Sequence, residues 1–299
     1  MIKILIVGVG RSGTSLIHSI VGSHPNIISI TENQIFRNII SKYGYNSLIT
    51  DYSDFKLFLS KNSNFDRLNI SDIDLKILHT KSLNYNHFYQ NLLLYFKKDN
   101  LGVCEKDPRS IDLFEKLINI DDKYKIIHIY RDPRSVISSR LKVKWVKIKS
   151  VIYHSIIYNL QLLLFYKKYD NFHENIHNVR YEDLVQRPEE TIIKLCDFLN
   201  VKFSQEMLSF HKTSNNIVSE EEKEWKLETF KPITNYSKKY KESLTTKQQI
   251  KVDLFTPIAF KKLKYKLTKH NLLLSFLING INLIYKLILP FYSFLIKKK

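Results

Sequence analysis

Residues 4–15, with the sequence ILIVGVGRSGTS, constrain the fold of this chain more than any other segment. An apolar, β-branched run enters a loop with three glycines, and apolar residues at helical spacing follow. This order predicts a strand, a tight turn and a helix. Gly8, Gly13 and Ser15 match the phosphate-binding pattern G-x-x-x-x-G-K-[ST], but Thr14 stands in the position of the lysine. Because amides at the start of such a helix bind anions, the segment predicts an anion site. The alternative is an ordinary strand–helix turn.

The missing lysine argues against nucleoside triphosphate chemistry. In kinases and NTPases that lysine contacts the β- and γ-phosphates, while the next hydroxyl holds Mg²⁺. Arg11 lies in the same loop and brings a permanent positive charge to it. We therefore expect the amides from Arg11 to Ser15, with this guanidinium, to bind an anion other than the terminal phosphates of ATP.

The net charge of +18 suggests an anionic partner, but the composition weakens that argument. Lysine provides 38 of the 47 basic residues, and Ala259 is the only alanine among 299 residues. A bias toward Lys, Ile and Asn with almost no Ala is typical of AT-rich coding sequence. We therefore expect no nucleic-acid partner.

The cysteine content and the first residues bear on the cellular compartment. Cys104 and Cys196 lie far apart without metal-ligand spacing, so we expect reduced thiols and no metal site. A strand is expected from Ile2, and charged loop residues follow too soon for the apolar region of a secretory signal peptide. These features predict a cytoplasmic protein.

The segment 266–299 differs from the domain that we assign to residues 1–265. Its mostly apolar run from Asn271 to Ile296 is flanked by lysines and is long enough to span a bilayer as a helix. Lys286 and Pro290 oppose a lipid-exposed spanning helix. Polar residues recur on one helix face, namely Ser275, Asn279, Asn282, Lys286 and Ser293. We expect a C-terminal apolar helix at a membrane surface, and the alternative is packing on its own domain or on a dimer partner.

The rest of the chain alternates between predicted strands and helices. The predicted strands begin at Ile2 and continue with residues 27–31, Leu101–Glu105, Lys125–Tyr130 and Ile176–Arg180. The predicted helices are Ser12–Val21, one that begins at Asp132–Pro133, Val151–Tyr169 and Pro188–Leu199. Residues 33–100 have a helical, aromatic-rich pattern and are expected to wall a substrate cleft. This order predicts a three-layer α/β fold with a central parallel sheet.

Four polar clusters fall where predicted strands end: residues 11–15, Glu32, Lys106 and Arg131. The carboxyl ends of parallel strands meet at one edge of a sheet, so we expect these side chains in one crevice. Ser139 follows Arg131 by eight residues, close to two helical turns, so both side chains can hold one phosphate.

The motifs GRSGTS, HP followed by a glutamate, EKDP, YRDPRSVISSR, VRYEDLVQRPEE and FLNV resemble a known family. They occur in the order found in sulfotransferases that use 3′-phosphoadenosine 5′-phosphosulfate (PAPS). The resemblance covers about residues 1–240 and is nearest to the branch with tyrosylprotein and bacterial glycan sulfotransferases. It implies a P-loop-like α/β fold, PAPS as co-substrate and no metal.

The resemblance also implies roles for individual residues. Glu32 is expected to be the general base, Lys106 to stabilise charge on the departing nucleotide, and Arg11 to neutralise the transferred group. The residues expected to bind the donor are Arg11, Ser12, Gly13, Thr14 and Ser15 for the 5′-phosphosulfate, Arg131 and Ser139 for the 3′-phosphate, and also Tyr181 and Lys231. A core role for Tyr181 is the alternative.

Two departures from the family pattern bear on these assignments. The stretch EEEKEWK has no match in the family pattern and weakens the resemblance at Lys231, and Gln34 stands where the tyrosylprotein branch carries arginine, which argues against a peptidyl-tyrosine acceptor. We expect transfer to a hydroxyl or amine of a glycan, a glycolipid or another small molecule, with a carbohydrate or lipid-linked glycan favoured. Two other functions stay open: an atypical kinase or NTPase, and a non-catalytic protein that binds anionic surfaces.

Overall fold

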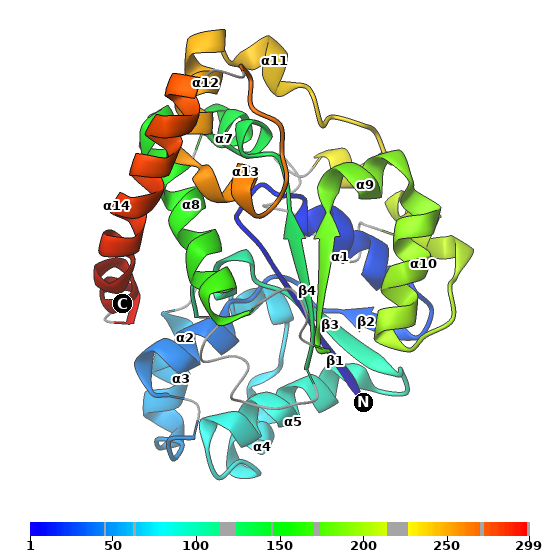
Figure 1. Ribbon diagram of the computed structural model, residues 1–299. Helices are drawn as coiled ribbons and strands as arrows, with labels where there is room; N and C mark the ends of the chain where they lie inside the picture. The colour runs from blue at the N-terminus through cyan, green and yellow to red at the C-terminus, as the bar shows by residue number, and fades with distance from the viewer. Residues whose placement is uncertain are drawn as a thin grey trace.

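The computed structural model describes residues 1–44, 46–61, 64–113, 124–144, 146–169, 174–213, 227–269 and 272–297 (Figure 1). Its centre is a sheet of five strands: β1 (Ile2–Val7), β2 (Ile27–Ser29), β3 (Gly102–Lys106), β4 (Tyr124–Tyr130) and β5 (Ile176–Arg180). The strands run parallel in the order β2-β3-β1-β4-β5. Since β1 lies in the middle, the loop that follows it is flanked by the ends of β3 and β4.

Helices cover one face of the sheet and pack on every second residue of the strands. These helices are α1 (Thr14–Gly22), α9 (Tyr181–Gln186), α10 (Pro188–Leu199) and the 3₁₀ segment η3 (Gln205–Lys212). Ile4 and Ile6 of β1 are buried in one cluster with Ile17 and Ile20 of α1. Side chains alternate between the two faces of a strand, so Leu5 faces the other layer.

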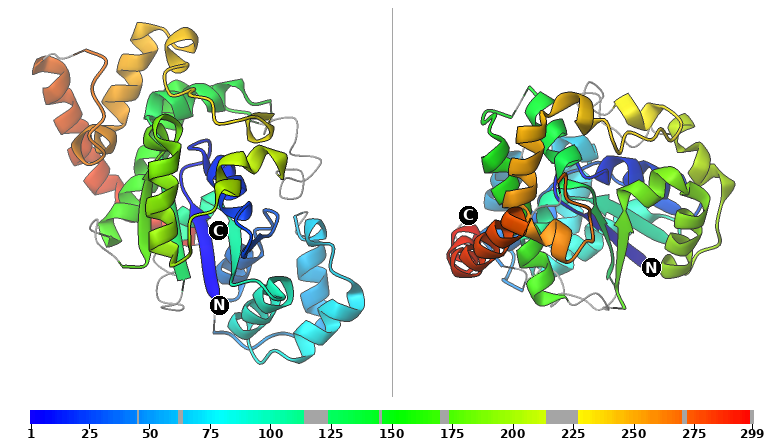
Figure 2. Two further views of the ribbon diagram at one scale, coloured as in Figure 1. Left: turned by 90° about the vertical axis from the view of Figure 1, so that its right-hand side faces the viewer. Right: turned by 45° about the horizontal axis from the view of Figure 1, so that its top comes forward.

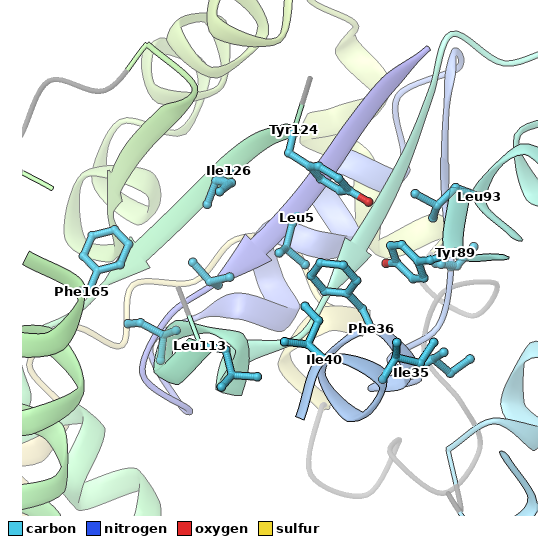
Figure 3. Packing of buried hydrophobic residues seen from close by; sticks show 14 of the residues in the cluster. Leu5, Ile35, Phe36, Ile40, Tyr89, Leu93, Leu113, Tyr124, Ile126 and Phe165 are labelled. Carbon is cyan, nitrogen blue, oxygen red and sulfur yellow. The ribbon is translucent and has the colours of Figure 1, made fainter. Parts of the chain in front are cut away.

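The opposite face packs on a larger set of helices. They are α2 (Ile35–Lys42), α3 (Tyr52–Ser60), α4 (Asp72–Thr80), α5 (Tyr85–Lys97), α8 (Val151–Lys168) and α13 (Pro257–Lys261). Figure 3 shows Leu5 between the aromatic side chains of this cluster, among them Phe36 and Tyr89, whose ring centres are 4.6 Å apart. Burial of each large apolar side chain contributes about 1.5–3 kcal/mol, so this layer is a principal source of stability.

Side-chain caps define where α3, α4 and α5 begin. Asp51 accepts hydrogen bonds from the amides of Ser53 and Asp54 at the start of α3. Ser71 and Asn84 cap α4 and α5 in the same way. Each cap satisfies amides that have no partner within the helix and contributes about 1 kcal/mol. The predicted helical character of this region is thereby explained.

The C-terminal part of the chain lies beside α8. It comprises α11 (Tyr240–Ser243), α12 (Thr246–Phe255), α13 and α14 (Leu272–Lys297), and α7 (Pro133–Lys142) lies next to it. Figure 2 shows α14 along one side of the molecule, against α8. Leu160 of α8 is buried in a cluster with Tyr285 and Leu289 of α14.

The predicted fold class is confirmed, and most predicted elements lie within two residues of the observed ones. α1 begins at Thr14 instead of Ser12, because Gly13 adopts a left-handed backbone conformation with φ of 104°. The strand predicted over residues 27–31 ends at Ser29, where its ladder with β3 stops. The EEEKEWK stretch, Asn271 and the last two lysines lie outside the described residues.

Buried Glu105 of β3 predicts a pH dependence of stability. Its carboxylate accepts a hydrogen bond from the Tyr89 hydroxyl. Burial raises the pKa of Glu105 from 4.5 to about 8. The folded-state pKa lies above the unfolded value, so the folded protein keeps a proton that the unfolded chain releases. The free energy of unfolding therefore falls as the pH rises from 4.5 to about 8.

Glu105→Gln removes this titration. Between about pH 5 and pH 8 we expect the variant to gain free energy of unfolding relative to the wild type, by roughly 1 kcal/mol per pH unit. Urea unfolding across this range measures the difference, and Glu206→Gln, which changes an exposed side chain, is the matched control. A difference that stays constant with pH contradicts the account.

Candidate functional site

The loops at the carboxyl ends of β1, β4 and β5 enclose a cavity of about 620 Å³. Its lining includes six basic side chains: Arg11, Arg131, Lys142, Lys144, Lys231 and Lys239. No aspartate or glutamate is among the described residues that line it. A concave site with charges of one sign concentrates ligands of the opposite sign, so the cavity is suited to a polyanion.

The loop between β1 and α1 forms one wall of this cavity. Arg11 has a φ of 78° and Gly13 a φ of 104°, both in the left-handed region. Such a conformation is strained for arginine and persists where the surrounding structure fixes it, often at functional sites. The guanidinium of Arg11 donates from Nε to the Ser139 hydroxyl over 3.0 Å. The amides of the first turn of α1 lack acceptors within the helix, and Thr14 and Ser15 line the cavity, so this wall has the character of an anion-binding site.

The ring of Tyr181 lies between this loop and Arg131. A Cβ atom on Gly13 would lie 2.6 Å from Cδ2 of Tyr181, so only glycine allows this approach. On the ring of Tyr181, the guanidinium carbon of Arg131 lies 3.8 Å from the ring centre. Such a cation–π contact contributes about 0.5–2 kcal/mol and orients the guanidinium. Tyr181 therefore holds the glycine turn and Arg131 at a fixed separation.

Arg131 carries a donor that no other described residue uses. Its Nη2 donates to the Tyr236 carbonyl over 3.1 Å, and the Tyr158 hydroxyl donates to its carbonyl over 2.8 Å. The Nε atom is buried and has no hydrogen-bond partner among the described residues. Since an unpaired buried donor is unfavourable by about 1–3 kcal/mol, the arrangement fits an anionic ligand at Arg131.

Glu32 and Lys106 form an ion pair beside the loop. Nζ of Lys106 lies 2.5 Å from Oε2 of Glu32 and donates to the Ser15 hydroxyl over 3.2 Å. The Lys106 side chain is 2% exposed and that of Glu32 is 17% exposed, so the carboxylate is the member that reaches solvent. The Glu32 carboxylate, the Lys106 ammonium and the first turn of α1 thus lie next to one another, in that order, at the carboxyl edge of the sheet.

A buried network holds the elements that carry Arg131 and Tyr181. The Glu182 carboxylate accepts from the amide of Asp132 over 3.0 Å and from the Tyr265 hydroxyl over 2.8 Å. Arg134 pairs with Asp132 over 2.7 Å and donates to the Lys266 carbonyl over 2.9 Å. The segment before α14 therefore stabilises the loops that carry Arg131 and Tyr181.

A second cavity, of about 310 Å³, lies between α2 and the 3₁₀ segment η2 (Pro108–Leu113). Arg37, Lys42, Arg109 and Asp112 are among its lining residues. Nε of Arg37 lies 2.9 Å from a carboxylate oxygen of Asp107, the residue after Lys106. One side chain thus connects this cavity to the strand end that carries the ion pair.

The structure brings together most of the residues predicted for the site. Eight of the nine donor-binding candidates line the large cavity: Arg11, Gly13, Thr14, Ser15, Arg131, Ser139, Tyr181 and Lys231. Ser12 does not line it and is fully buried, with no hydrogen-bond partner for its hydroxyl among the described residues. Glu32 and Lys106 do not line it either and connect to it through Ser15.

Sequence reasoning missed three basic residues that line the cavity, Lys142, Lys144 and Lys239. The alternating KVK at the end of α7 is the one local signal for Lys142 and Lys144. Within the described residues, no group of three or more His, Cys, Asp or Glu side chains is placed to hold a metal ion.

Comparison with known proteins gives consistent matches. Residues 3–205 match the model of the sulfotransferase family. A candidate protein-tyrosine sulfotransferase of Caenorhabditis briggsae is 23% identical over 217 residues, which cover 70% of this chain and 69% of that protein. The sulfotransferase domain of the Synechococcus PCC 7002 olefin synthase is 16% identical, with a TM-score of 0.58 and coverage of 89% and 95%. Sulfotransferase STF9 from Mycobacterium avium is 11% identical, with a TM-score of 0.50 and coverage of 90% and 78%. The two solved structures share the fold.

The Gly13–Tyr181 contact predicts the effect of two glycine substitutions. Gly13→Ala places a Cβ against the Tyr181 ring and forces alanine into the left-handed region, so we expect a loss of about 1–3 kcal/mol in free energy of unfolding. Gly10→Ala is the matched control, because the nearest atom to its added Cβ is 3.7 Å away. Denaturant unfolding of both variants is the measurement. Equal losses in the two variants contradict the account.

Proposed function

Because the chain belongs to the sulfotransferase family, we propose that it transfers a sulfuryl group from PAPS to a hydroxyl or amine of an acceptor. The observation that carries this proposal is the basic cavity with the first turn of α1 in its wall and Arg131 in its lining, beside the Glu32–Lys106 pair. PAPS carries anionic groups at two separate positions, and the cavity offers two separate cationic positions. Thr14 in place of the phosphate-loop lysine disfavours the kinase alternative.

Two positions in the cavity are suited to the two ends of the donor. The amides of Thr14 and Ser15 and the guanidinium of Arg11 bind the 5′-phosphosulfate. Arg131, whose Nε donor is unpaired among the described residues, binds the 3′-phosphate together with Ser139. Lys231, which also lines the cavity, adds positive charge to it. The hydrogen bond between Arg11 and Ser139 connects the two positions.

Glu32 acts as the general base and Lys106 stabilises the leaving group. The acceptor oxygen attacks sulfur in line and forms a new S–O bond, while its proton passes to Glu32. The S–O bond to the nucleotide breaks, and its electron pair stays on the phosphate oxygen as adenosine 3′,5′-bisphosphate departs. Lys106 lies between Glu32 and Ser15 and so can stabilise charge on that oxygen without leaving its position.

The acceptor that we propose is a carbohydrate or a lipid-linked glycan. The second cavity supports this proposal, because several of its lining residues are polar or charged and Arg37 connects it to the strand end of Lys106. Gln34, which accepts a hydrogen bond from Arg37 over 2.6 Å, offers an amide suited to sugar hydroxyls.

Nucleotide binding tests the assignment of the donor. We expect isothermal titration calorimetry to give roughly 10- to 100-fold tighter binding of adenosine 3′,5′-bisphosphate than of AMP, because the 3′-phosphate gains charge-assisted hydrogen bonds to Arg131. Arg131→Met should remove most of that difference, and Arg187→Met, an exposed control, should preserve it. Equal affinities of the wild type for the two nucleotides contradict the proposal.

Substitution of Glu32 tests the proposed base. Glu32→Gln should bind adenosine 3′,5′-bisphosphate within about threefold of the wild type and lose roughly 10²- to 10⁴-fold in turnover, because the residues proposed to bind the nucleotide are unchanged and the proton acceptor is lost. Transfer of radiolabelled sulfate from PAPS, to an acceptor that the wild type sulfates in a panel of glycans and glycolipids, measures turnover. Full activity in the variant excludes the role.

A further inference from the structure

Helix α14 has three distinct faces along its length. One face packs on the domain, where Leu274, Ile278, Tyr285 and Leu289 are buried. At 100° per residue these four side chains fall within a narrow arc of the helix. Tyr285 also donates to the Phe255 carbonyl over 2.8 Å, so this face is fixed to the end of α12. The domain thereby determines which other faces of α14 point outward.

The outward side of α14 is mostly apolar. The exposed apolar residues are Leu272, Leu273, Phe276, Leu277, Leu283, Ile284, Leu287, Ile288, Phe291, Phe294 and Leu295. At the same helical spacing they cover an arc of roughly 160°, and no charged residue lies within it. Phe276 is 74% exposed and Leu287 is 76% exposed. A contiguous apolar patch that is this exposed is typical of an interaction site.

The third face is a polar stripe between the other two. It contains the five residues predicted to align, Ser275, Asn279, Asn282, Lys286 and Ser293. Lys286 is exposed, and it is the only charged side chain between Lys269 and Lys297. The apolar arc and the polar stripe thus lie side by side, as in helices that rest in the plane of a membrane surface.

The charge around α14 complements an anionic surface. Residues 261–299 contain nine lysines and no acidic residue, half of the net charge of +18. Lys261, Lys264, Lys266 and Lys269 precede the helix and are exposed. Each lysine near an anionic membrane contributes about 1 kcal/mol of attraction. This cationic segment adjoins the apolar arc and is continuous with it along the chain.

We propose that the apolar arc of α14 docks on an anionic lipid surface, with the helix lying flat in the headgroup region. A second copy of the chain is a poorer occupant, since lysines border the helix at both ends and pairing in either direction brings like charges together. The 24-residue stretch Leu272–Leu295 is long and apolar enough to cross a membrane, but its opposite face is fixed to α8 and α12.

Docking in this orientation bears on the acceptor, a point that rests on the proposed function. Near the end of α14, the Tyr292 hydroxyl interacts electrostatically with Arg109 and Asp112, which line the second cavity. α14 also packs against η2, which carries Arg109 and Asp112. When α14 is docked, the second cavity therefore lies close to the lipid headgroups, where a lipid-linked glycan is presented.

Vesicle co-sedimentation of the full chain tests the docking. We expect binding to phosphatidylcholine vesicles with about one third phosphatidylglycerol to be at least about tenfold tighter than to phosphatidylcholine alone. The combined variant Phe276→Ser, Leu287→Ser, Phe291→Ser should bind at least about tenfold more weakly. The matched control is Leu57→Ser, Ile73→Ser, Leu94→Ser, three exposed apolar residues on α3, α4 and α5, and it should bind like the wild type.

Two vesicle results overturn the proposal: the wild type binds neither vesicle, or the α14 variant binds like the wild type. A wild-type dimer that the α14 substitutions convert to a monomer in sedimentation velocity also overturns it, because a second copy then covers the apolar arc. Vesicle-bound protein that resists alkaline extraction overturns it as well, because a spanning helix behaves in this way. Since vesicle binding is read without nucleotide, its failure is distinct from a failure of the proposed function. Unchanged calorimetric binding of adenosine 3′,5′-bisphosphate by the α14 variant shows that the domain stays folded.

Discussion

The close approach of Gly13 to the ring of Tyr181 is the contact on which the candidate site depends. It requires glycine, because a Cβ would lie 2.6 Å from the ring, and the Arg131 guanidinium is centred 3.8 Å from that same ring. The turn after β1, the end of β4 and the start of α9 are thereby held in one arrangement. The two proposed anion-binding positions are thereby held at a fixed separation, which suits a ligand with two anionic groups such as PAPS.

The polar groups behind the site explain how the C-terminal segment takes part in it. Glu182 connects the amide of Asp132 to the Tyr265 hydroxyl, and Arg134 reaches the Lys266 carbonyl. Burial of such groups is favourable only when all are paired, so the network requires this segment to be in place. The same segment leads into α14, so this helix and the loops of the candidate site share one support.

The sequence determines the fold well where local patterns are strong. α10 has the predicted bounds and β4 begins one residue before its predicted start, because a proline at the first helical position and an apolar run are local signals. The Tyr181–Arg131 stack was not predictable, since it joins residues 50 positions apart. Lys239 was missed for the same reason. The polar stripe of α14 followed from its spacing, but both remaining faces are apolar, and only tertiary packing decides which one the domain covers.

The measurement that tests the central claim most directly is sulfate transfer by the intact chain. Purified protein is incubated with radiolabelled PAPS and extracts of glycans and glycolipids, with and without Mg²⁺, and in parallel with ATP. The account predicts labelled acceptor and an equal amount of adenosine 3′,5′-bisphosphate. Consumption of ATP that depends on Mg²⁺, without any transfer of sulfate, contradicts it.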